Sequence, residues 1–220
     1  MVDLIRELSA TTIAANLETV AGAIAAAGRS PGEVEVLAAV KYVPVEELGT
    51  LGEAGVTLVG ENRAQDLVTK AEAYPGRFTW DFIGHLQSRK VRSVLGHVRY
   101  IHSVASDSVL AQLERHADPA TEVLIEVNVS GEPGKDGVSP EALPRFIDRC
   151  PVTVVGLMTM PPIAARSEDS RPHFATLRGL AERHGLRHLS MGTSQDYPVA
   201  LEEGATIIRI GTSLYAPSAA

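Results

Sequence analysis

Short apolar runs alternate with longer amphipathic stretches along most of this chain. Apolar residues spaced three and four apart predict a first helix from Asp3 to Ala27, closed by Gly28. The runs that follow predict eight strands, at Val34–Val40, Thr57–Gly60, Thr79–Gly84, Arg99–Val104, Glu122–Val129, Thr153–Leu157, Arg187–Met191 and Thr206–Ile210. The stretches between them predict helices at Val45–Ala54, Ala64–Ala73, Ser106–Ala117, Pro140–Arg149 and Ser170–His184.

This alternation indicates an α/β fold with a parallel sheet. Eight strand–helix units are typical of a closed (β/α)8 barrel. An open doubly wound sheet is the alternative, and it usually carries a glycine-rich turn after its first strand. Here the first strand is followed by Lys41-Tyr42-Val43-Pro44, which contains no glycine. We therefore predict one α/β domain over residues 1–220, a TIM barrel with an extra N-terminal helix.

Composition narrows the classes of partner. Hydrophobic residues make up 45% of the chain, enough for a sizeable core, and the net charge of −7 disfavours general binding of nucleic acid. Cys150 is the single cysteine, so no internal disulfide can form. The N-terminus has charges where a signal peptide needs apolar residues, and no run of apolar residues is long enough to span a membrane. We expect a cytoplasmic protein without a metal site, a nucleic-acid partner or a membrane partner.

Lys41 lies at the carboxyl end of the first predicted strand, where barrels of this kind carry their chemistry. Burial at the mouth of an apolar strand would lower the pKa of its amine. A lysine of that kind is a nucleophile that forms an imine with an aldehyde. The alternative is a lysine that only solubilises the end of a strand.

Two clusters of small polar residues predict an anion site. Ser190–Ser194 follows the seventh strand, and Arg209–Ser213 follows the eighth. The loops after these two strands often hold phosphate in such barrels, although Gly, Ser and Thr also fill ordinary turns. A nucleophilic lysine beside a phosphate site indicates pyridoxal 5′-phosphate (PLP). Arg209 near its pyridine nitrogen would keep that nitrogen unprotonated and weaken carbanion stabilisation.

Eight segments, spread in order over nearly the whole chain, carry a resemblance to a known family. They are Ala38–Lys41, Gly60–Gln65, Phe82–Gln87, Ile101–Val104, Glu126–Ser130, Gly156–Pro161, Leu189–Gly192 and Ile208–Gly211. The chain resembles the pyridoxal phosphate homeostasis proteins, whose barrel is of the alanine racemase N-terminal type.

The resemblance implies which residues contact the cofactor. PLP would be held as an imine on Lys41, with Arg209 near the pyridine nitrogen and Asn62 in the pocket wall. The residues expected at the phosphate are Ser190, Gly192, Gly211 and Thr212. Met158, at the end of the sixth strand, completes the expected cofactor-binding set.

The resemblance also implies a role in intracellular PLP homeostasis or delivery and in amino-acid balance, without established catalysis. PLP-dependent apo-enzymes are the candidate recipients. The alternative is a PLP-dependent racemase or related enzyme of low activity. Racemases of this barrel type carry a second, β-rich domain that supplies a catalytic tyrosine and builds the dimer. This sequence stops after the eighth unit, so we assign no catalytic residue and expect a monomer. A weaker alternative is a barrel that binds another phosphate ester.

Overall fold

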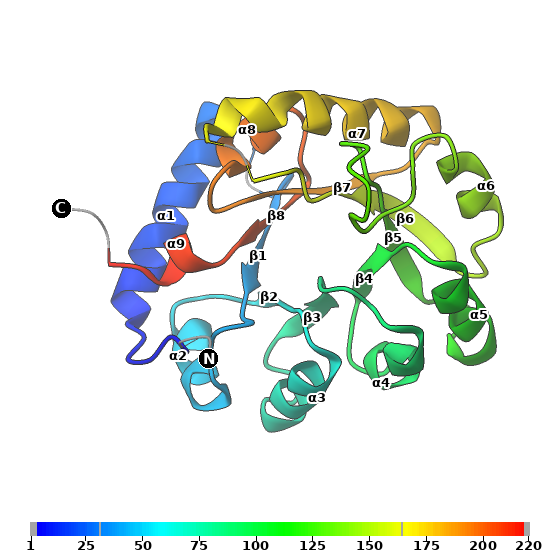
Figure 1. Ribbon diagram of the computed structural model, residues 1–220. Coiled ribbons are helices and arrows are strands. Elements are labelled where there is room, and N and C mark those ends of the chain that lie inside the picture. The colour runs from blue at the N-terminus through cyan, green and yellow to red at the C-terminus, as the bar shows by residue number, and fades with distance from the viewer. Residues whose placement is uncertain (1–3, 31, 164, 218–220) are drawn as a thin grey trace.

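Eight parallel strands close into a barrel and follow one another around it in sequence order (Figure 1). The computed structural model describes residues 4–30, 32–163 and 165–217. The strands are β1 (Glu35–Ala39), β2 (Leu58–Glu61), β3 (Thr79–Phe82), β4 (Tyr100–Val104), β5 (Glu122–Glu126), β6 (Thr153–Met158), β7 (His188–Thr193) and β8 (Ile207–Ile210). Parallel pairing of β1 with β8 closes the ring, so the predicted single-domain barrel is confirmed.

Helices surround the barrel (Figure 1). They are α1 (Ala10–Ala26), α2 (Leu48–Glu53), α3 (Ala64–Ala73), α4 (Val91–Leu95), α5 (Asp107–His116), α6 (Leu143–Asp148), α7 (Arg171–Arg183), α8 (Tyr197–Glu202) and α9 (Thr212–Tyr215). Short 3-10 turns precede α2, α4 and α7. Within the described ranges, no helix is long and apolar enough to cross a membrane.

The first helix begins later than the sequence predicted. The Ser9 hydroxyl accepts a hydrogen bond from the Thr12 N–H at 3.2 Å and caps α1 at its start. Before the cap, the Ile5 N–H donates to the Tyr42 carbonyl at 2.8 Å, which draws the chain across the end of β1. The predicted start at Asp3 lies outside the described residues.

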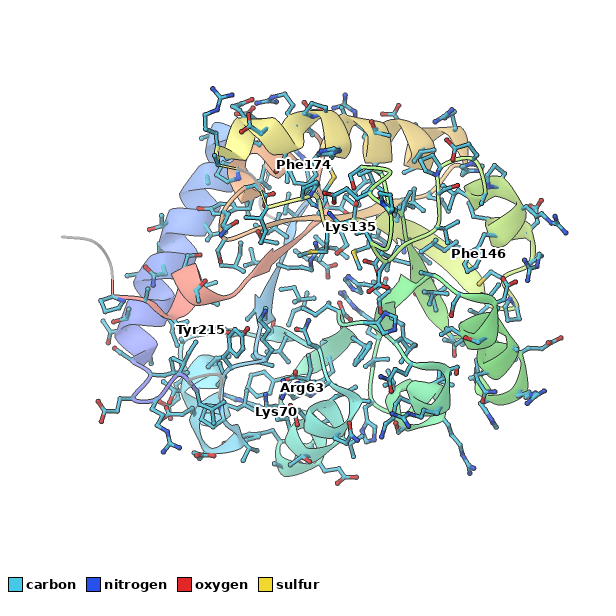
Figure 2. The ribbon with its side chains drawn as sticks, in the orientation of Figure 1. Arg63, Lys70, Lys135, Phe146, Phe174 and Tyr215 are labelled. Atoms are coloured by element: carbon cyan, nitrogen blue, oxygen red, sulfur yellow. The ribbon has the colours of Figure 1, made fainter. Side chains whose placement is uncertain are left out.

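Two apolar clusters form the core. The larger lies between the strands and the surrounding helices and includes Phe146 of α6 and Phe174 of α7 (Figure 2). The smaller fills the barrel interior and consists of Leu37, Leu58, Tyr100, Leu124, Val155, Met158 and Ile207, with Ile83 packed against it. Strands that are buried on both faces appear in the sequence as nearly continuous apolar runs. The strands could therefore be predicted from the hydrophobic pattern.

Candidate functional site

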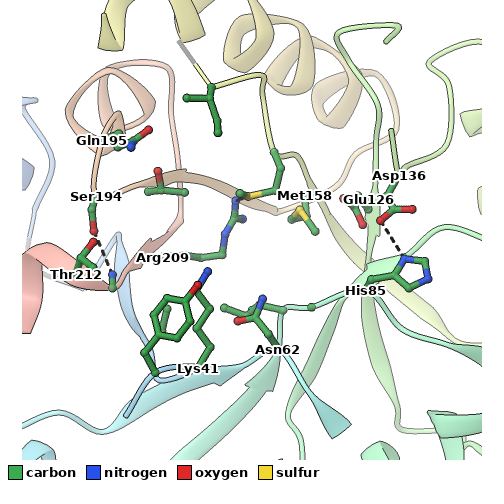
Figure 3. A pocket seen from close by; sticks show the side chains of 18 of the residues that line it. Lys41, Asn62, His85, Glu126, Asp136, Met158, Ser194, Gln195, Arg209 and Thr212 are labelled. Atoms are coloured by element: carbon green, nitrogen blue, oxygen red, sulfur yellow. Dashed lines mark hydrogen bonds and ion pairs between the residues drawn. The ribbon is translucent and has the colours of Figure 1, made fainter. Parts of the chain in front are cut away.

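A cavity of about 600 Å³ opens at the carboxyl ends of the strands (Figure 3). Six of the eight residues that the sequence singled out line it: Lys41, Asn62, Met158, Arg209, Gly211 and Thr212. They come from both halves of the chain and meet because the strands run parallel. The barrel therefore brings the candidate nucleophile and the loop after β8 to one cavity.

Lys41 follows β1, and its side chain lies at the cavity (Figure 3). Its ammonium nitrogen is 4.6 Å from the centre of the Tyr42 ring, a cation–π contact. Lys41 is exposed, so the burial that the sequence predicted for it is wrong for this structure. The reason is that the strand ends at Ala39 and the side chain leaves the sheet above its apolar layer. The amine is therefore accessible to a ligand that enters the cavity.

Arg209 of β8 projects into the cavity from a buried position (Figure 3). One terminal nitrogen, Nη1, donates to the Ser190 carbonyl at 2.7 Å and to the Ser190 hydroxyl at 2.6 Å. The other, Nη2, donates to the Thr159 carbonyl at 2.9 Å. Burial lowers the pKa of Arg209 to about 10, and the carboxylates of Glu126 and Asp196 oppose that effect. The guanidinium is therefore still a fixed positive charge at neutral pH.

Ser190 and Gly192, the other two residues singled out, are not among the residues that line the cavity. Ser190 is fully buried beneath Arg209. Gly192 has a φ of 90°, and a Cβ there would lie 2.6 Å from the Ala200 Cβ and 3.0 Å from the Tyr197 Cα. Gly192 thus allows β7 to pack closely on α8. Contact of either residue with a phosphate stays a prediction.

The loops after β7 and β8 do meet, through a residue that the site prediction left out. The Ser194 hydroxyl accepts from the N–H groups of Gly211 and Ser213, at 3.2 and 3.4 Å. Ser194 and Thr212 both line the cavity. Because the Ser194 oxygen accepts these two N–H groups, its own hydrogen is left to donate, and the Ser194 and Thr212 hydroxyls are donors that suit an anionic group.

Asn62 follows β2 and presents an unpaired acceptor to the cavity. Its backbone N–H donates to the Glu61 carboxylate at 2.7 Å. Its side-chain oxygen Oδ1 is buried and has no hydrogen-bond partner among the described residues. Buried polar atoms are nearly always paired in folded proteins. An unpaired one in a cavity wall is therefore suited to a ligand that donates a hydrogen bond.

Glu126, at the end of β5, is a lining residue that the sequence analysis did not identify. It is 8% exposed, and its pKa is raised to about 7, first by burial and then by the nearby Asp136 carboxylate. Asp136 itself lies 3.0 Å from His85 Nδ1 across the same side of the cavity (Figure 3). Glu126 was missed because it lies within the predicted strand Glu122–Val129, which the structure ends at Glu126.

Sequence comparisons place this architecture among known proteins. The family model described as the alanine racemase N-terminal domain matches residues 9–219. A pyridoxal phosphate homeostasis protein from Aquifex aeolicus is 41% identical over 213 residues, which cover 90% of this chain and 93% of that protein. Another of the same name, from Pseudomonas aeruginosa, is 37% identical over 93% of this chain and 95% of its own length.

Solved structures agree in fold. PipY from Synechococcus elongatus, solved with PLP bound, has a TM-score of 0.77 and 30% identity, covering 93% of this chain and all of that one. A Bifidobacterium adolescentis protein described as unknown has a TM-score of 0.86 and 31% identity, covering 97% of this chain and 98% of that one. Alanine racemase from Corynebacterium glutamicum has a TM-score of 0.73 at 14% identity, covering 97% of this chain and 62% of its own, and shows the fold alone.

Proposed function

The chain belongs to the family of pyridoxal phosphate homeostasis proteins, and on that basis we propose that it binds PLP in the cavity above β1 and β8. The observation that carries the proposal is the meeting of the Lys41 amine, the Arg209 charge and the polar loop wall in one cavity. PLP has an aldehyde, a basic ring nitrogen and a phosphate, and the three features can bind these three groups one to one.

The residues present fit such a ligand. The cavity volume of about 600 Å³ lies within the range of roughly 300–1,000 Å³ that small-molecule sites occupy. The unpaired Asn62 oxygen offers an acceptor for the ring hydroxyl of PLP. The N–H groups of Gly211 and Ser213 already bind an oxygen, that of Ser194. Buried Met158 adds an apolar surface for a flat ring.

Each of these residues has a proposed task. The Lys41 amine holds the ligand covalently through an imine bond to its aldehyde. Protonated Arg209 orients the ring and keeps the ring nitrogen unprotonated. Ser194, Gly211 and Thr212 hold the phosphate. PLP, when bound, supplies an electron sink for amino-acid chemistry, which an arginine at the ring nitrogen makes weaker.

The biological role that we propose is the storage and delivery of PLP, with PLP-dependent apo-enzymes as recipients. Support comes from the relatives' shared name and from the exposed Lys41, which leaves the covalent link open to transfer. Incubation of the PLP-loaded protein with an apo-enzyme, followed by recipient activity, tests delivery. Recovery no faster than with free PLP would contradict it. The monomeric state stays a prediction that size-exclusion chromatography with light scattering measures.

A slow PLP-dependent amino-acid enzyme is the second candidate, and Glu126 is the observation that favours it. A carboxyl group with a pKa of about 7 inside the cavity is suited to proton transfer at neutral pH. Exchange of α-protons of amino acids in deuterated water, measured by NMR on the parent and on Glu126→Gln, tests it. Exchange that the variant loses would favour the enzyme over the carrier.

Visible absorbance spectroscopy tests the covalent link. We expect the protein with PLP to show a visible band that borohydride abolishes, and Lys41→Ala to lack it. Lys135 also lines the cavity, so Lys135→Ala is the matched control and should keep the band. Peptide mass spectrometry after reduction should find the pyridoxyl group on Lys41. A label on Lys135, or no band in the parent protein, would overturn the assignment.

A further inference from the structure

A chain of buried polar groups runs from the cavity into the barrel interior. It begins where Arg209 Nη1 donates to the Ser190 hydroxyl at 2.6 Å. Ser190 Oγ lies 2.8 Å from His102 Nδ1, and His102 Nε2 lies 3.1 Å from Asp81 Oδ2. Ser190, His102 and Asp81 are all 0% exposed. The groups belong to β8, β7, β4 and β3, so this series of hydrogen bonds crosses the barrel.

The donors and acceptors in this chain have one consistent direction. Arginine only donates, so the Ser190 oxygen accepts from Arg209 and its own hydrogen is left to donate. The other partner of that hydroxyl is His102 Nδ1, and assigning this nitrogen as the acceptor gives both the Ser190 hydrogen and the Asp81 carboxylate a partner. The ring proton is consequently on Nε2 and is donated to the Asp81 carboxylate. His102 is therefore neutral, in the Nε2–H tautomer.

The charges around the chain support that direction. Burial lowers the pKa of His102, and its hydrogen bond with Asp81 offsets this only in part. Burial alone would raise the pKa of Asp81, but His102 and Arg99 outweigh it and the pKa is lowered. Arg99 binds both Asp81 oxygens, at 3.1 and 2.7 Å. Asp81 is thus an ionised acceptor held by Arg99, and His102 is a neutral link.

Such a chain has no evident use for stability alone. The apolar cluster of Leu37, Leu124 and their neighbours packs in the same barrel interior, and buried ionic groups are often matched or surpassed in stability by apolar replacements. The end of the chain that faces the cavity is Arg209, the charge that the proposed function uses. Ser190, which the family resemblance assigns to the phosphate, is instead engaged with Arg209 and is absent from the cavity wall.

We propose that Asp81, His102 and Ser190 form a buried relay that positions the Arg209 guanidinium at the cavity, and that Ser190 serves Arg209 and not the phosphate. The relay holds the Ser190 hydroxyl, which accepts the hydrogen bond from Arg209 Nη1, in one position. The direction in which the Arg209 guanidinium points into the cavity is thereby fixed. Ser190, His102 and Asp81 are positioning residues in this assignment. The ligand part of the proposal rests on the proposed function, whereas the relay itself exists in the ligand-free protein.

Two serines provide a matched test of the ligand part. Ser194 lines the cavity and Ser190 does not. The probes are PLP and pyridoxal, which lacks the phosphate, with affinities measured by fluorescence titration for the parent, Ser190→Ala and Ser194→Ala. A hydrogen bond to a charged group changes affinity by about tenfold or more. We expect Ser194→Ala to lower PLP affinity about tenfold more than pyridoxal affinity.

For Ser190→Ala we expect both affinities to fall by the same factor, because a displaced Arg209 affects the ring that the two ligands share. A selective loss of PLP affinity in this variant, as in Ser194→Ala, would overturn the assignment, and so would an unchanged affinity for both ligands. If the parent protein binds neither ligand, the proposed function fails, and the relay is decided by the measurement on ligand-free protein described next.

Nitrogen NMR of the His102 ring tests the relay without any ligand. We expect a neutral Nε2–H ring at pH 7 in the parent, and a shift of the Nδ1 resonance in Ser190→Ala. Ser190→Thr, which restores a hydroxyl, should return the Nδ1 resonance toward the parent value. A positively charged ring, or the Nδ1–H tautomer, would overturn the relay. Ser194→Ala, as the control, should leave the His102 resonances unchanged.

Discussion

The ammonium of Lys70 lies 2.8 Å from the carbonyl oxygen of Val40, the residue immediately before Lys41. The same ammonium forms a 2.6 Å ion pair with Glu61, whose other oxygen accepts the Asn62 N–H. Lys70 belongs to α3, just outside the barrel (Figure 2). One buried pair therefore fixes the ends of β1 and β2, from which two of the cavity residues extend.

Loss of this pair should destabilise the fold. Lys70→Met leaves the fully buried Glu61 carboxylate without its cation, which costs about 3–5 kcal/mol in similar buried pairs. We expect the free energy of unfolding in urea to fall by that order. The double variant Lys70→Met/Glu61→Gln, which removes both charges, should recover part of the loss. A double variant no more stable than the single one would show that the two charges do not stabilise the ends of β1 and β2.

Glu126 should make the protein less stable as the pH rises. Its pKa is about 7 in the folded protein against an ordinary value of 4.5, so the folded state holds a proton that the unfolded state has lost between these pH values. The contribution of Glu126 to the free energy of unfolding is complete below pH 4.5 and is lost as the pH rises through 7. The whole contribution is about 3 kcal/mol.

Urea unfolding at pH 5, 6, 7 and 8 measures that loss. Glu126→Gln, which cannot ionise, should show a smaller decrease in stability over this interval than the parent. The same substitution at Glu122, at the opposite end of β5, is the control and should keep the parent's pH dependence. Parallel curves for Glu126→Gln and the parent would contradict the shifted pKa.

Gly192→Ala should destabilise the fold even though the residue does not line the cavity. The φ of 90° disfavours any side chain, and the new Cβ would collide with Ala200 and Tyr197. We expect a loss of about 2–4 kcal/mol in the free energy of unfolding. Gly179→Ala is the control, because that glycine lies within α7 with open space around its Cβ position and should gain about 0.5–1 kcal/mol. Equal thermal midpoints for the two variants would refute the packing role.

Asn62→Leu should separate binding from stability. The Oδ1 atom of Asn62 has no hydrogen-bond partner within residues 4–30, 32–163 and 165–217, so the free energy of unfolding without ligand should stay within about 1 kcal/mol of the parent. Affinity for PLP should fall about tenfold if this oxygen accepts from the ligand. Asn128→Leu is the contrast, because the Asn128 amide binds Glu132 and Gly131 and its loss should destabilise the loop. A large loss in the free energy of unfolding of Asn62→Leu would show that the Asn62 amide stabilises the fold and does not serve ligand binding alone.

The strands could be read from the sequence because each is an apolar run buried on both faces, as in Val34–Val40 around β1. The helices α4 and α8 were not predicted. They are no shorter than α2 or only one residue shorter, so length alone does not explain the difference. Both rest on buried contacts at residues such as Val94 and Val199. Tertiary packing, which a local pattern does not contain, stabilises them.

The site residues also fall into those that the local sequence pattern predicts and those that depend on the fold. Lys41 and Arg209 stand out because charge follows or interrupts an apolar strand. Glu126 did not stand out, since its place at the cavity depends on where β5 ends. The burial of Ser190 under Arg209 depends on how β7 and β8 align, and a register shift lies between them at Ser190 and Thr193. Register between distant strands is a property of the folded barrel.

Pairing of β1 with β8 has a consequence for biosynthesis. Lys41 leaves the ribosome long before Ile207–Ile210, the strand that closes the ring and carries Arg209. The side chain of Asn16 in α1 also binds the carbonyls of Leu214 and Ala216, so the two ends of the fold secure each other. A nascent chain therefore has the nucleophile without the cavity. The cavity that joins Lys41 to Arg209 is therefore complete only after β8 has been synthesised and has paired with β1.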